Sequence, residues 1–391
     1  MADWRDCRLG DLGIVSGGGT PSRERAEYWD GPIPWITPGE LTGNRKKFVS
    51  ETQDSLSELG LAVSGANLLP ERSLLVTSRA SIGSCALTGK PMATNQGFKS
   101  LIPHADVDPS FLFHLGQTLG REMTRRASGT TFLEISAREF EHILIRLPPL
   151  DEQQRIADIL DTIDEAIQAI ERVIAKLIRV REGLRRSQFA GLALSSEFHP
   201  VGECFEMTLG KMLSPAARTG SNPAPYLANR NVQWERCSLD DLDEMDFTHT
   251  ERVKFSLELG DVLVCEGGEV GRTAIWHGEL KTCFFQKAIH RLRTRGKVMP
   301  EFMLHYMKYA AESDLFKMHT SQTSIAHLTG EQLARLPIPV PSKEVQTTVV
   351  GVLAALSRRL EVENEQLQKV CRIRNGVSSD LLSGRVRTVA T

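Results

Sequence analysis

The most regular pattern in this chain is a seven-residue apolar repeat between positions 152 and 187. Its positions form two interleaved rows: Ile156, Leu160, Ile163, Ile167, Ile170, Ile174, Leu177 and Leu184. Two such rows predict one long helix with the seam of a coiled coil. Pro148, Pro149 and Asp151 stand just before it, and prolines followed by an acidic residue favour a helix start. A helix of about 35 residues rises roughly 50 Å and is marginally stable alone, so we expect it to pair with a second helix.

The partner helix is predicted within the same chain, because the pattern returns 193 residues later. Adding 193 carries Pro148 to Pro341, and the second seam keeps apolar side chains at Val349, Leu353, Leu356, Leu360, Leu367 and Val370. Glu363 stands where the first helix has Ile170, so the second seam is the weaker one. If the two helices pair with each other, the short glycine-containing link after Gly191 and the links after each proline motif favour an antiparallel pair with pseudo-twofold symmetry.

The segments before the two helices repeat as well, at slowly drifting offsets. The sequence PSFLFH at 109–114 matches PEFMLH at 300–305, and residues 72–87 match residues 260–275. The chain is therefore one unit written twice, a globule of about 150 residues followed by a long helix. The early loops of the two globules differ most, which favours one task performed on two different targets.

Short apolar runs predict strands at 73–76, 143–147, 262–264 and 274–276, and proline-led amphipathic segments predict helices at 109–126 and 300–317. The fold class that we expect is mixed α/β (α+β), with two globular domains, each followed by a long helix. The expected boundaries are a first target-recognition domain at 1–147, a helical spacer at 148–190, a second recognition domain at 191–340, a second helical spacer at 341–385 and a tail at 386–391.

Composition limits the partners that the chain can have. A net charge of −2 excludes a chain that is basic throughout, so any nucleic-acid surface must be local. The seven cysteines form no C-x-x-C pair, which is typical of reduced thiols in the cytoplasm rather than of a disulfide framework or a zinc site. No signal peptide or long apolar run is present, and we expect a cytoplasmic protein that does not enter a membrane.

The motifs of self-contained enzymes are missing from the sequence. There is no phosphate-binding G-x-x-x-x-G-K-[ST] loop, and the glycines at 267–271 fall short of a dinucleotide fingerprint and favour a turn between strands. The ten histidines show no metal-ligand spacing, and His114 and His305 are interpreted as packing or capping residues. We therefore expect no cofactor and no metal in this chain and no catalytic residue.

Basic and hydroxyl side chains occupy corresponding places in the two units and are candidates for phosphate contacts. They are Arg125, Arg126 and Thr130 in the first unit, and Lys317, Ser321 and Thr323 in the second. The alternative is that the basic residues only complement the end of a helix, while the hydroxyls cap the next one.

A second group of candidates lies in the divergent loops, where arginine can pair with guanine and asparagine or glutamine with adenine. In the first unit they are Thr20, Ser22, Arg23, Thr37, Arg79 and Gln96. In the second unit they are Arg218, Thr219, Asn229, Arg230, Asn231, Gln233, Gln286 and Lys287. Each of them could also be an ordinary solvated loop residue.

The arrangement resembles the specificity subunit of type I restriction-modification systems over essentially the full chain. The resemblance rests on PPLDEQQRIADIL at 148–160, on GGGTPSR at 17–23 with IPWITPGEL at 33–41, and on PYLANRNVQW at 225–234 with GDVLVCEGGEVGRTAIW at 260–276. The second helix departs from the pattern, with Glu344, Val345 and Gln346 where the first has Asp151, Glu152 and Gln153.

The resemblance implies a non-catalytic subunit that reads a bipartite site on double-stranded DNA, one half-site per recognition domain. It also implies two modification subunits that bind S-adenosylmethionine and methylate adenine, and it leaves room for a restriction subunit that uses ATP and Mg²⁺. Two rival hypotheses are a stand-alone methyltransferase, which would need the missing cofactor loop, and a coiled-coil adaptor that binds protein without reading DNA.

Overall fold

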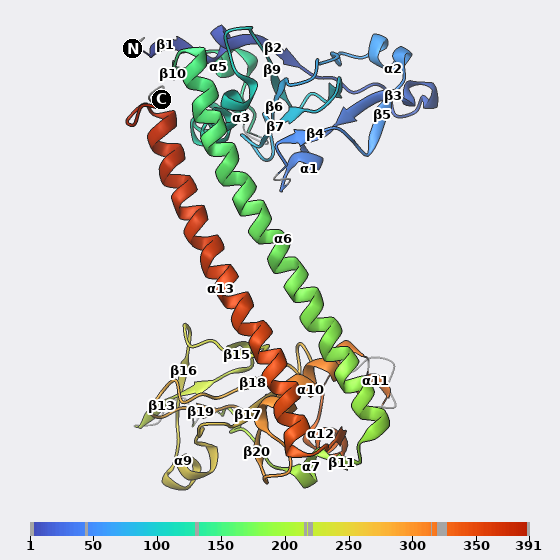
Figure 1. Cartoon of the computed structure of the whole chain (residues 1–391), viewed down its shortest axis with the longest axis vertical. Coiled ribbons are helices and arrows are strands. Elements are labelled where there is room, and N and C mark those ends of the chain that lie inside the picture. The colour runs from blue at the N-terminus through green and yellow to red at the C-terminus, as the bar shows by residue number, and fades with distance from the viewer. Residues whose placement is uncertain are drawn as a thin grey trace. The chain divides into compact units, whose positions relative to one another are not determined.

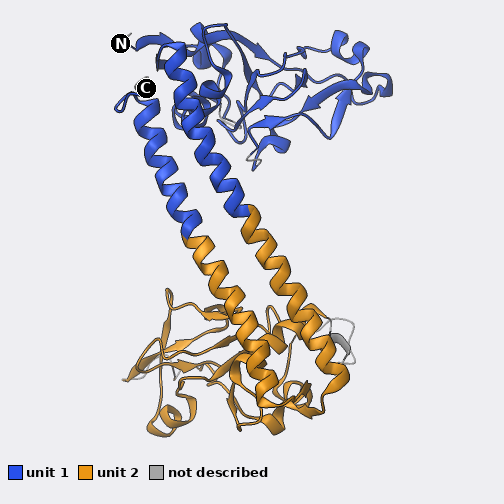
Figure 2. Cartoon of the chain, in the orientation of Figure 1, with its two compact units in different colours: residues 1–171, 366–391 blue, residues 172–365 orange. Residues whose placement is uncertain are grey.

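The structure is a computed structural model that describes residues 4–43, 46–129, 133–214, 217, 222–313, 315–318 and 327–388. The chain divides into two compact units (Figure 2): unit 1 holds residues 1–171 and 366–391, and unit 2 holds residues 172–365. Both long helices, α6 (Leu150–Ser195) and α13 (Lys343–Leu382), contribute one half to each unit. Within the described residues, no helix is long and apolar enough to span a membrane.

The globular part of unit 1 is built on a five-stranded sheet of order β2-β9-β6-β7-β4, a three-stranded sheet β5-β3-β8 and the pair β1-β10 (Figure 1). The strands are β1 (Arg5–Arg8), β2 (Gly13–Gly17), β3 (Trp29–Ile36), β4 (Phe48–Val49), β5 (Asp54–Leu56), β6 (Leu74–Val76), β7 (Cys85–Thr88), β8 (Ala93–Thr94), β9 (Lys99–Pro103) and β10 (Leu144–Leu147). The helices are η1 (Leu9–Leu12), η2 (Ala26–Tyr28), α1 (Pro38–Leu41), α2 (Glu58–Val63), α3 (Pro109–Thr118), α4 (Gly120–Arg126) and α5 (Ala137–Glu141).

Unit 2 repeats most of this topology: among the described residues its main sheet matches the first four strands of the five-stranded sheet, and the pair β14-β15 is additional. Its sheets are β12-β20-β17-β18, β16-β13-β19, β14-β15 and β11-β21. The strands are β11 (Phe198–Pro200), β12 (Phe205–Leu209), β13 (Pro223–Leu227), β14 (Val232–Gln233), β15 (Arg236–Cys237), β16 (Asp243–Asp246), β17 (Val262–Cys265), β18 (Thr273–Ile275), β19 (Phe284–Phe285), β20 (Ile289–Thr294) and β21 (Pro337–Pro339). The helices are α7 (Val201–Cys204), η3 (Asn229–Asn231), α9 (His249–Phe255), α10 (Pro300–Glu312), α11 (Leu315–Met318) and α12 (Gly330–Arg335).

Equivalent strands of the two units pair in the same sense. β3 runs parallel to β8 and antiparallel to β5, and β13 runs parallel to β19 and antiparallel to β16. The strand pair that closes each globule, β1 with β10 or β11 with β21, is antiparallel in both units. The mixed α/β fold with two globular parts, each followed by a long helix, is therefore confirmed.

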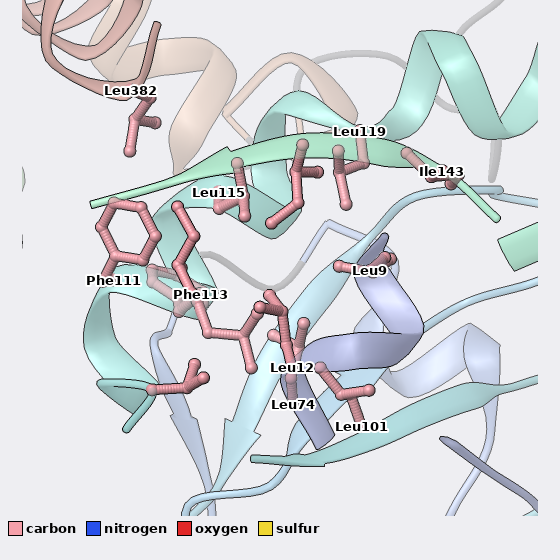
Figure 3. Packing of buried hydrophobic residues seen from close by; sticks show 14 of the residues in the cluster. Leu9, Leu12, Leu74, Leu101, Phe111, Phe113, Leu115, Leu119, Ile143 and Leu382 are labelled. Carbon is pink, nitrogen blue, oxygen red and sulfur yellow. The ribbon is translucent and has the colours of Figure 1, made fainter. Parts of the chain in front are cut away.

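A single apolar core joins the globular part of unit 1 to its helix halves (Figure 3). Leu74 and Leu101 from the sheet, Phe111 and Leu115 from α3, and Leu382 from α13 belong to one buried cluster. Ile156 and Leu160 of α6 are in the same cluster and are fully buried. Burial of apolar surface therefore fixes the helix halves on the globule.

Within each unit the halves of α6 and α13 run in opposite directions. In unit 1, Arg374 of α13 contacts Asp164 of α6, whereas Arg387, beyond the end of α13, contacts Glu152 near the start of α6. In unit 2, Arg181 of α6 contacts Ser357 of α13. Every predicted seam position is buried or partly buried on both helices, and the pairing of these positions across a seam stays a prediction.

A buried glutamine anchors the start of each long helix to its globule. The Gln153 side chain donates to the carbonyls of Pro148 and Asp106 and accepts from the backbone N–H of Asp108. Gln346 makes the same three kinds of bond in unit 2, to Pro341, Lys297 and Met299. This shared role explains why the repeat keeps a polar residue at a site that is closed to water.

The helix expected at residues 109–126 is wrong in one respect, because the structure divides it into α3 and α4 at Leu119 and Gly120. A Cβ on Gly83 would lie 2.5 Å from the Cα of Gly120, so the backbone of the turn after β6 is in close contact with the chain at this point. The segment expected at 300–317 is likewise divided into α10 and α11.

Candidate nucleic-acid interface

Three loops of unit 1 that are far apart in sequence meet beside the ends of its sheets. The backbone N–H of Gly19 donates to the Thr94 carbonyl at 2.9 Å, and the N–H of Ser78 donates to the Gly97 carbonyl at 2.8 Å. The loop after β2, the turn after β6 and the loop after β8 therefore form one surface, which we call loop surface 1.

Loop surface 1 brings together three of the candidate base-reading residues. The Thr20 hydroxyl donates to Oε1 of Gln96 at 2.6 Å, which fixes the orientation of the amide. The side chain of Arg79 passes over Gly97, where an added Cβ would lie 3.1 Å from Nε. Glycine is needed there because a larger residue would also meet the ring of Pro38 at 2.6 Å.

The other loop candidates of unit 1 make internal contacts. Arg23 pairs with Asp54 at 2.7 Å, and its guanidinium lies 3.8 Å from the ring centre of Trp29. The backbone carbonyl of Ser22 accepts a hydrogen bond from the same indole. The hydroxyl of Thr37 bonds with Glu40 at the start of α1. For these three residues a contact with DNA stays a prediction.

Arg125 and Arg126 share one carboxylate in the last turn of α4. Both donate to Glu122, and Arg126 also contacts Glu139. These hydrogen bonds lower the pKa of the Glu122 carboxyl to about 2. The geometry matches the alternative in which basic side chains complement a helix end, and the phosphate role stays a prediction. Thr130 lies outside the described residues.

The candidates in and beside the η3 turn of unit 2 differ in exposure. Asn231 is buried, where its Oδ1 accepts from the Ala228 N–H and its amide donates to two loop carbonyls. Asn229 donates to the Gly267 carbonyl at 3.0 Å. Arg230 is exposed and pairs with Asp243 at 2.9 Å, and Gln233 donates to the Arg230 carbonyl.

The loop between β19 and β20 carries Gln286 and Lys287, at the place that corresponds to Gln96. The Gln286 N–H bonds the Leu227 carbonyl, and the Lys287 N–H bonds that of Lys211. The loop is thus held against the ends of β12 and β13, with the Lys287 side chain exposed. Arg218, Thr219, Ser321 and Thr323 lie outside the described residues, and Lys317 is in α11 with its side chain outside the description.

Charge pairing separates the arginine and lysine candidates into two groups. Arg23, Arg125, Arg126 and Arg230 each bond a carboxylate. Among the described residues, Arg79 and Lys287 make no ion pair. Lys211 was missed by sequence reasoning, and its ammonium bonds Glu251 and the Asp246 carbonyl beneath the 286–287 loop. In the sequence, the only indication of this position was that Lys211 corresponds to Gly19 of the first copy of the repeat.

Both histidines that repeat between the units are buried. His114 bonds Asp161 at 2.9 Å, and His305 lies near Arg185 and Glu235. Within the part of the chain that the structure describes, no group of three or more His, Cys, Asp or Glu side chains could hold a metal ion.

A family model for the type I restriction modification DNA specificity domain matches residues 1–179 and again residues 199–372. The chain belongs to this family. The two matched segments coincide with the two copies of the internal repeat, so the specificity domain occurs twice in this chain.

Curated relatives in this family are specificity subunits of type I restriction enzymes. That of MjaIX from Methanocaldococcus jannaschii is 34% identical over 168 residues, which cover 42% of this chain and 39% of the relative. That of EcoR124I/EcoR124II from Escherichia coli is 30% identical over 187 residues, which cover 46% of this chain and 45% of the relative. These matches therefore span less than half the length of either relative.

Solved structures of specificity subunits share the fold along the whole chain. The S subunit of M. genitalium has a TM-score of 0.58 at 18% identity, with 100% of this chain and 97% of that chain covered. The HsdS subunit of Thermoanaerobacter tengcongensis has a TM-score of 0.52 at 17% identity, with 98% and 97% covered.

Proposed function

We propose that this chain is the non-catalytic specificity subunit of a type I restriction-modification complex and that it reads a bipartite, asymmetric site on double-stranded DNA. Each globular part would read one half-site. The observation that carries the proposal is one sheet topology built twice with unlike side chains on the corresponding loops. A shared scaffold with different loop residues suits two readers of different sequences.

The bases would be contacted from loop surface 1 and from its counterpart around Gln286 and Lys287. The carbonyl oxygen of the Gln96 amide accepts a hydrogen bond from Thr20, which orients the amide, and its NH₂ group would donate to an acceptor on a base. Arg79 lies beside it with a guanidinium suited to the paired acceptors of guanine. Phosphate contacts would come from the basic candidates Arg125 and Arg126 in unit 1 and Lys317 in unit 2.

The experiment that tests this proposal is co-expression with the candidate modification subunit, followed by mapping of methylated adenine across the host DNA. We expect a split, asymmetric motif with a fixed gap. The absence of new methylation, with both proteins soluble and associated, would contradict the proposal and favour the protein-binding adaptor.

Modification subunits would dock on apolar side chains that the seam leaves exposed. On α6, Val173 and Val180 are 42% and 46% exposed and stand seven residues apart in unit 2. On α13, Val345 and Val352 are 39% and 45% exposed with the same spacing. A second apolar row beside a filled seam is typical of a helix that packs on two partners.

We predict that Val173→Glu weakens the complex with the modification subunit by at least about tenfold, because it places a charge on the docking row. Ala175→Glu is the matched control: it adds the same charge at an exposed position of the same helix, outside this row. Size-exclusion chromatography of the mixed subunits measures the effect. If both variants lose the complex to the same extent, the docking row is not part of the interface.

A further inference from the structure

A polar cluster joins the globular part of each unit to its helix halves, and the charges on α6 and on the globule are exchanged between the two clusters: α6 supplies carboxylates in one and guanidinium groups in the other. Junction 1 consists of Lys47, His114 and Gln117 from the globule, Asp161 and Asp164 from α6, and Arg374 from α13. Junction 2 consists of Glu235 and Glu312 from the globule, Arg181 and Arg185 from α6, and Ser357 from α13.

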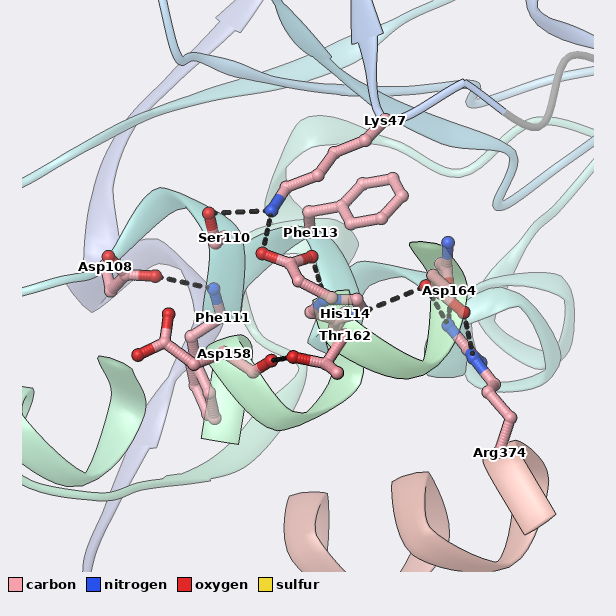
Figure 4. A network of polar contacts seen from close by, with 12 residues as sticks. Lys47, Asp108, Ser110, Phe111, Phe113, His114, Asp158, Thr162, Asp164 and Arg374 are labelled. Carbon is pink, nitrogen blue, oxygen red and sulfur yellow. Dashed lines mark hydrogen bonds and ion pairs between the residues drawn. The ribbon is translucent and has the colours of Figure 1, made fainter. Parts of the chain in front are cut away.

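In junction 1 the helix half of α6 supplies the carboxylates (Figure 4). Lys47 reaches Asp161 at 2.5 Å and also bonds Ser110 at 2.8 Å. His114 bonds the other oxygen of Asp161 at 2.9 Å. Arg374 then closes the cluster on Asp164 at 3.0 Å. The globule therefore presents a cation to an acidic helix surface.

In junction 2 the same helix supplies guanidinium groups instead. Arg181 and Arg185 each bond one oxygen of Glu235 at 2.9 Å. Arg185, whose side chain is fully buried, also reaches Glu312 at 3.3 Å. Glu235 lies between β14 and β15 with a φ of 67°, so the turn is held in an uncommon conformation that presents this carboxylate. Here the globule presents anions to a basic helix surface.

The repeat shows that the inversion lies at equivalent positions. Adding 193 to Asp161 and Asp164 gives Ala354 and Ser357, so unit 2 has lost both carboxylates. Arg181 corresponds to Arg374 and is kept, whereas Arg185 corresponds to Ser378, so unit 2 has an extra guanidinium. On the helices, differences at three corresponding positions thus account for the change from an acidic to a basic surface: Asp161 and Ala354, Asp164 and Ser357, and Ser378 and Arg185.

We propose that the charge of the junction decides which globular domain can be seated on which pair of helix halves. A second-unit globule placed on junction 1 would bring Glu235 and Glu312 against Asp161 and Asp164. Arg374 is kept there, but the second guanidinium is replaced by Ser378, so four carboxylates would face one arginine of the helices and the foreign globule is disfavoured. This inference rests on the proposed function. The match of charge between the globule and the helices limits which recognition domains the chain can exchange.

The test uses a full-length chimera in which residues 198–340 replace residues 5–147, so that both globules are of the second kind. Three substitutions, Asp161→Ala, Asp164→Ser and Ser378→Arg, give its first junction the helix residues of junction 2. We expect the three to raise the melting temperature of the chimera by roughly 5 °C and to lower that of the natural chain by a similar amount. The readout is unfolding without DNA, so it does not depend on the proposed DNA recognition.

A point substitution keeps the test decisive if the chimera does not fold. Lys47→Glu should lower the melting temperature of the natural chain, where it faces Asp161, and raise it in the chain with the three helix substitutions, where both carboxylates are gone and the helices carry an additional guanidinium. Opposite signs in the two backgrounds support the proposal. The same sign in both backgrounds, or equal melting temperatures for the two chimeras, would overturn it.

Discussion

At the scale of single residues, position in the fold decides what a repeated side chain does. Gln153 and Gln346 keep one role, because each is enclosed by the same backbone groups at the start of its helix. His114 and His305 also correspond, but they have different neighbours. His114 lies between two carboxylates, whereas His305 faces the guanidinium groups of junction 2.

This difference predicts a pH dependence for unit 2. Burial, with a smaller contribution from nearby Arg185, lowers the pKa of His305 to about 4, whereas an unfolded histidine titrates near 6.5. Between these values the unfolded chain binds the additional proton, so the stability of the fold falls as pH drops from about 6.5 to about 4. The total loss is about 3 kcal/mol.

Urea unfolding at pH 7 and at pH 5 measures the part of this loss that falls above pH 5, about 2 kcal/mol. His305→Gln should unfold with a weaker pH dependence than the natural chain. His104→Gln, at an exposed histidine of unit 1, should retain the natural dependence. The same slope in the natural chain and in His305→Gln would show that another group titrates.

Among the arginines, Arg79 is the strongest candidate for reading a base. It lies beside Gln96 and makes no ion pair among the described residues, so no carboxylate has to be displaced on binding. Arg79→Ala should weaken binding of the assembled complex to its own site by roughly 1–3 kcal/mol and relax the sequence preference at one position.

Fluorescence anisotropy with duplexes of the mapped motif and of variants at each position checks this prediction. Arg5→Ala is a suitable control, because Arg5 pairs with Asp106 outside the loop surface. A uniform loss of affinity for all duplexes would identify Arg79 as a phosphate contact instead.

At the scale of elements, Trp4 and Arg387 are both held against the start of α6. Arg387 donates two hydrogen bonds of 2.8 Å to the buried carboxylate of Glu152, and the Trp4 indole donates a third of 3.1 Å. The Arg387 bonds are the main reason that the pKa of Glu152 is lowered. We call these contacts of Trp4 and Arg387 with Glu152 the clasp. In the repeat, the segment after α13 that holds Arg387 corresponds to the C-terminal end of α6, which continues through Ser196 and Glu197 into β11. The clasp therefore stands in unit 1 where unit 2 has a covalent link.

We predict that Glu152→Gln destabilises unit 1 by roughly 1–3 kcal/mol, because a charge-assisted pair is replaced by a weaker one around a buried group. Asp158→Asn, at an exposed position on the same helix, should have little effect. Thermal unfolding measures both. If Glu152 acts through Arg387, then Arg387→Ala should add almost nothing in the Glu152→Gln background, and full additivity would contradict the clasp.

At the scale of the whole molecule, two copies of one specificity domain share a pair of helices. α6 and α13 each pass about half of their length through each unit, and the predicted seam positions of both helices are buried or partly buried. A helix advances by a fixed rise per residue, so helices with this arrangement are suited to set the spacing between two readers. This ruler role belongs to the proposed function.

Insertion of one heptad into both helices, after residues 171 and 365, tests the ruler. Seven residues keep the seam in phase and add about 10 Å, which corresponds to about three base pairs. We expect the methylated motif to keep both half-sites and to acquire a longer gap. Mapping of methylated adenine reads out both features, and altered half-sites would show that the helices do not act as a ruler.

The sequence by itself determined the repeat, the long helices with their seam, the strands near residues 74 and 262, and the mixed fold. All of these follow from periodicity, which is written along the chain and needs no knowledge of distant neighbours. Only the tertiary structure decided that Thr20, Arg79 and Gln96 share one surface, that Asn231 is buried, and that α6 supplies anions to one junction and cations to the other. Hydrogen bonds and ion pairs depend on distances between residues tens to hundreds of positions apart, such as Lys47 and Asp161, and no local pattern encodes those distances.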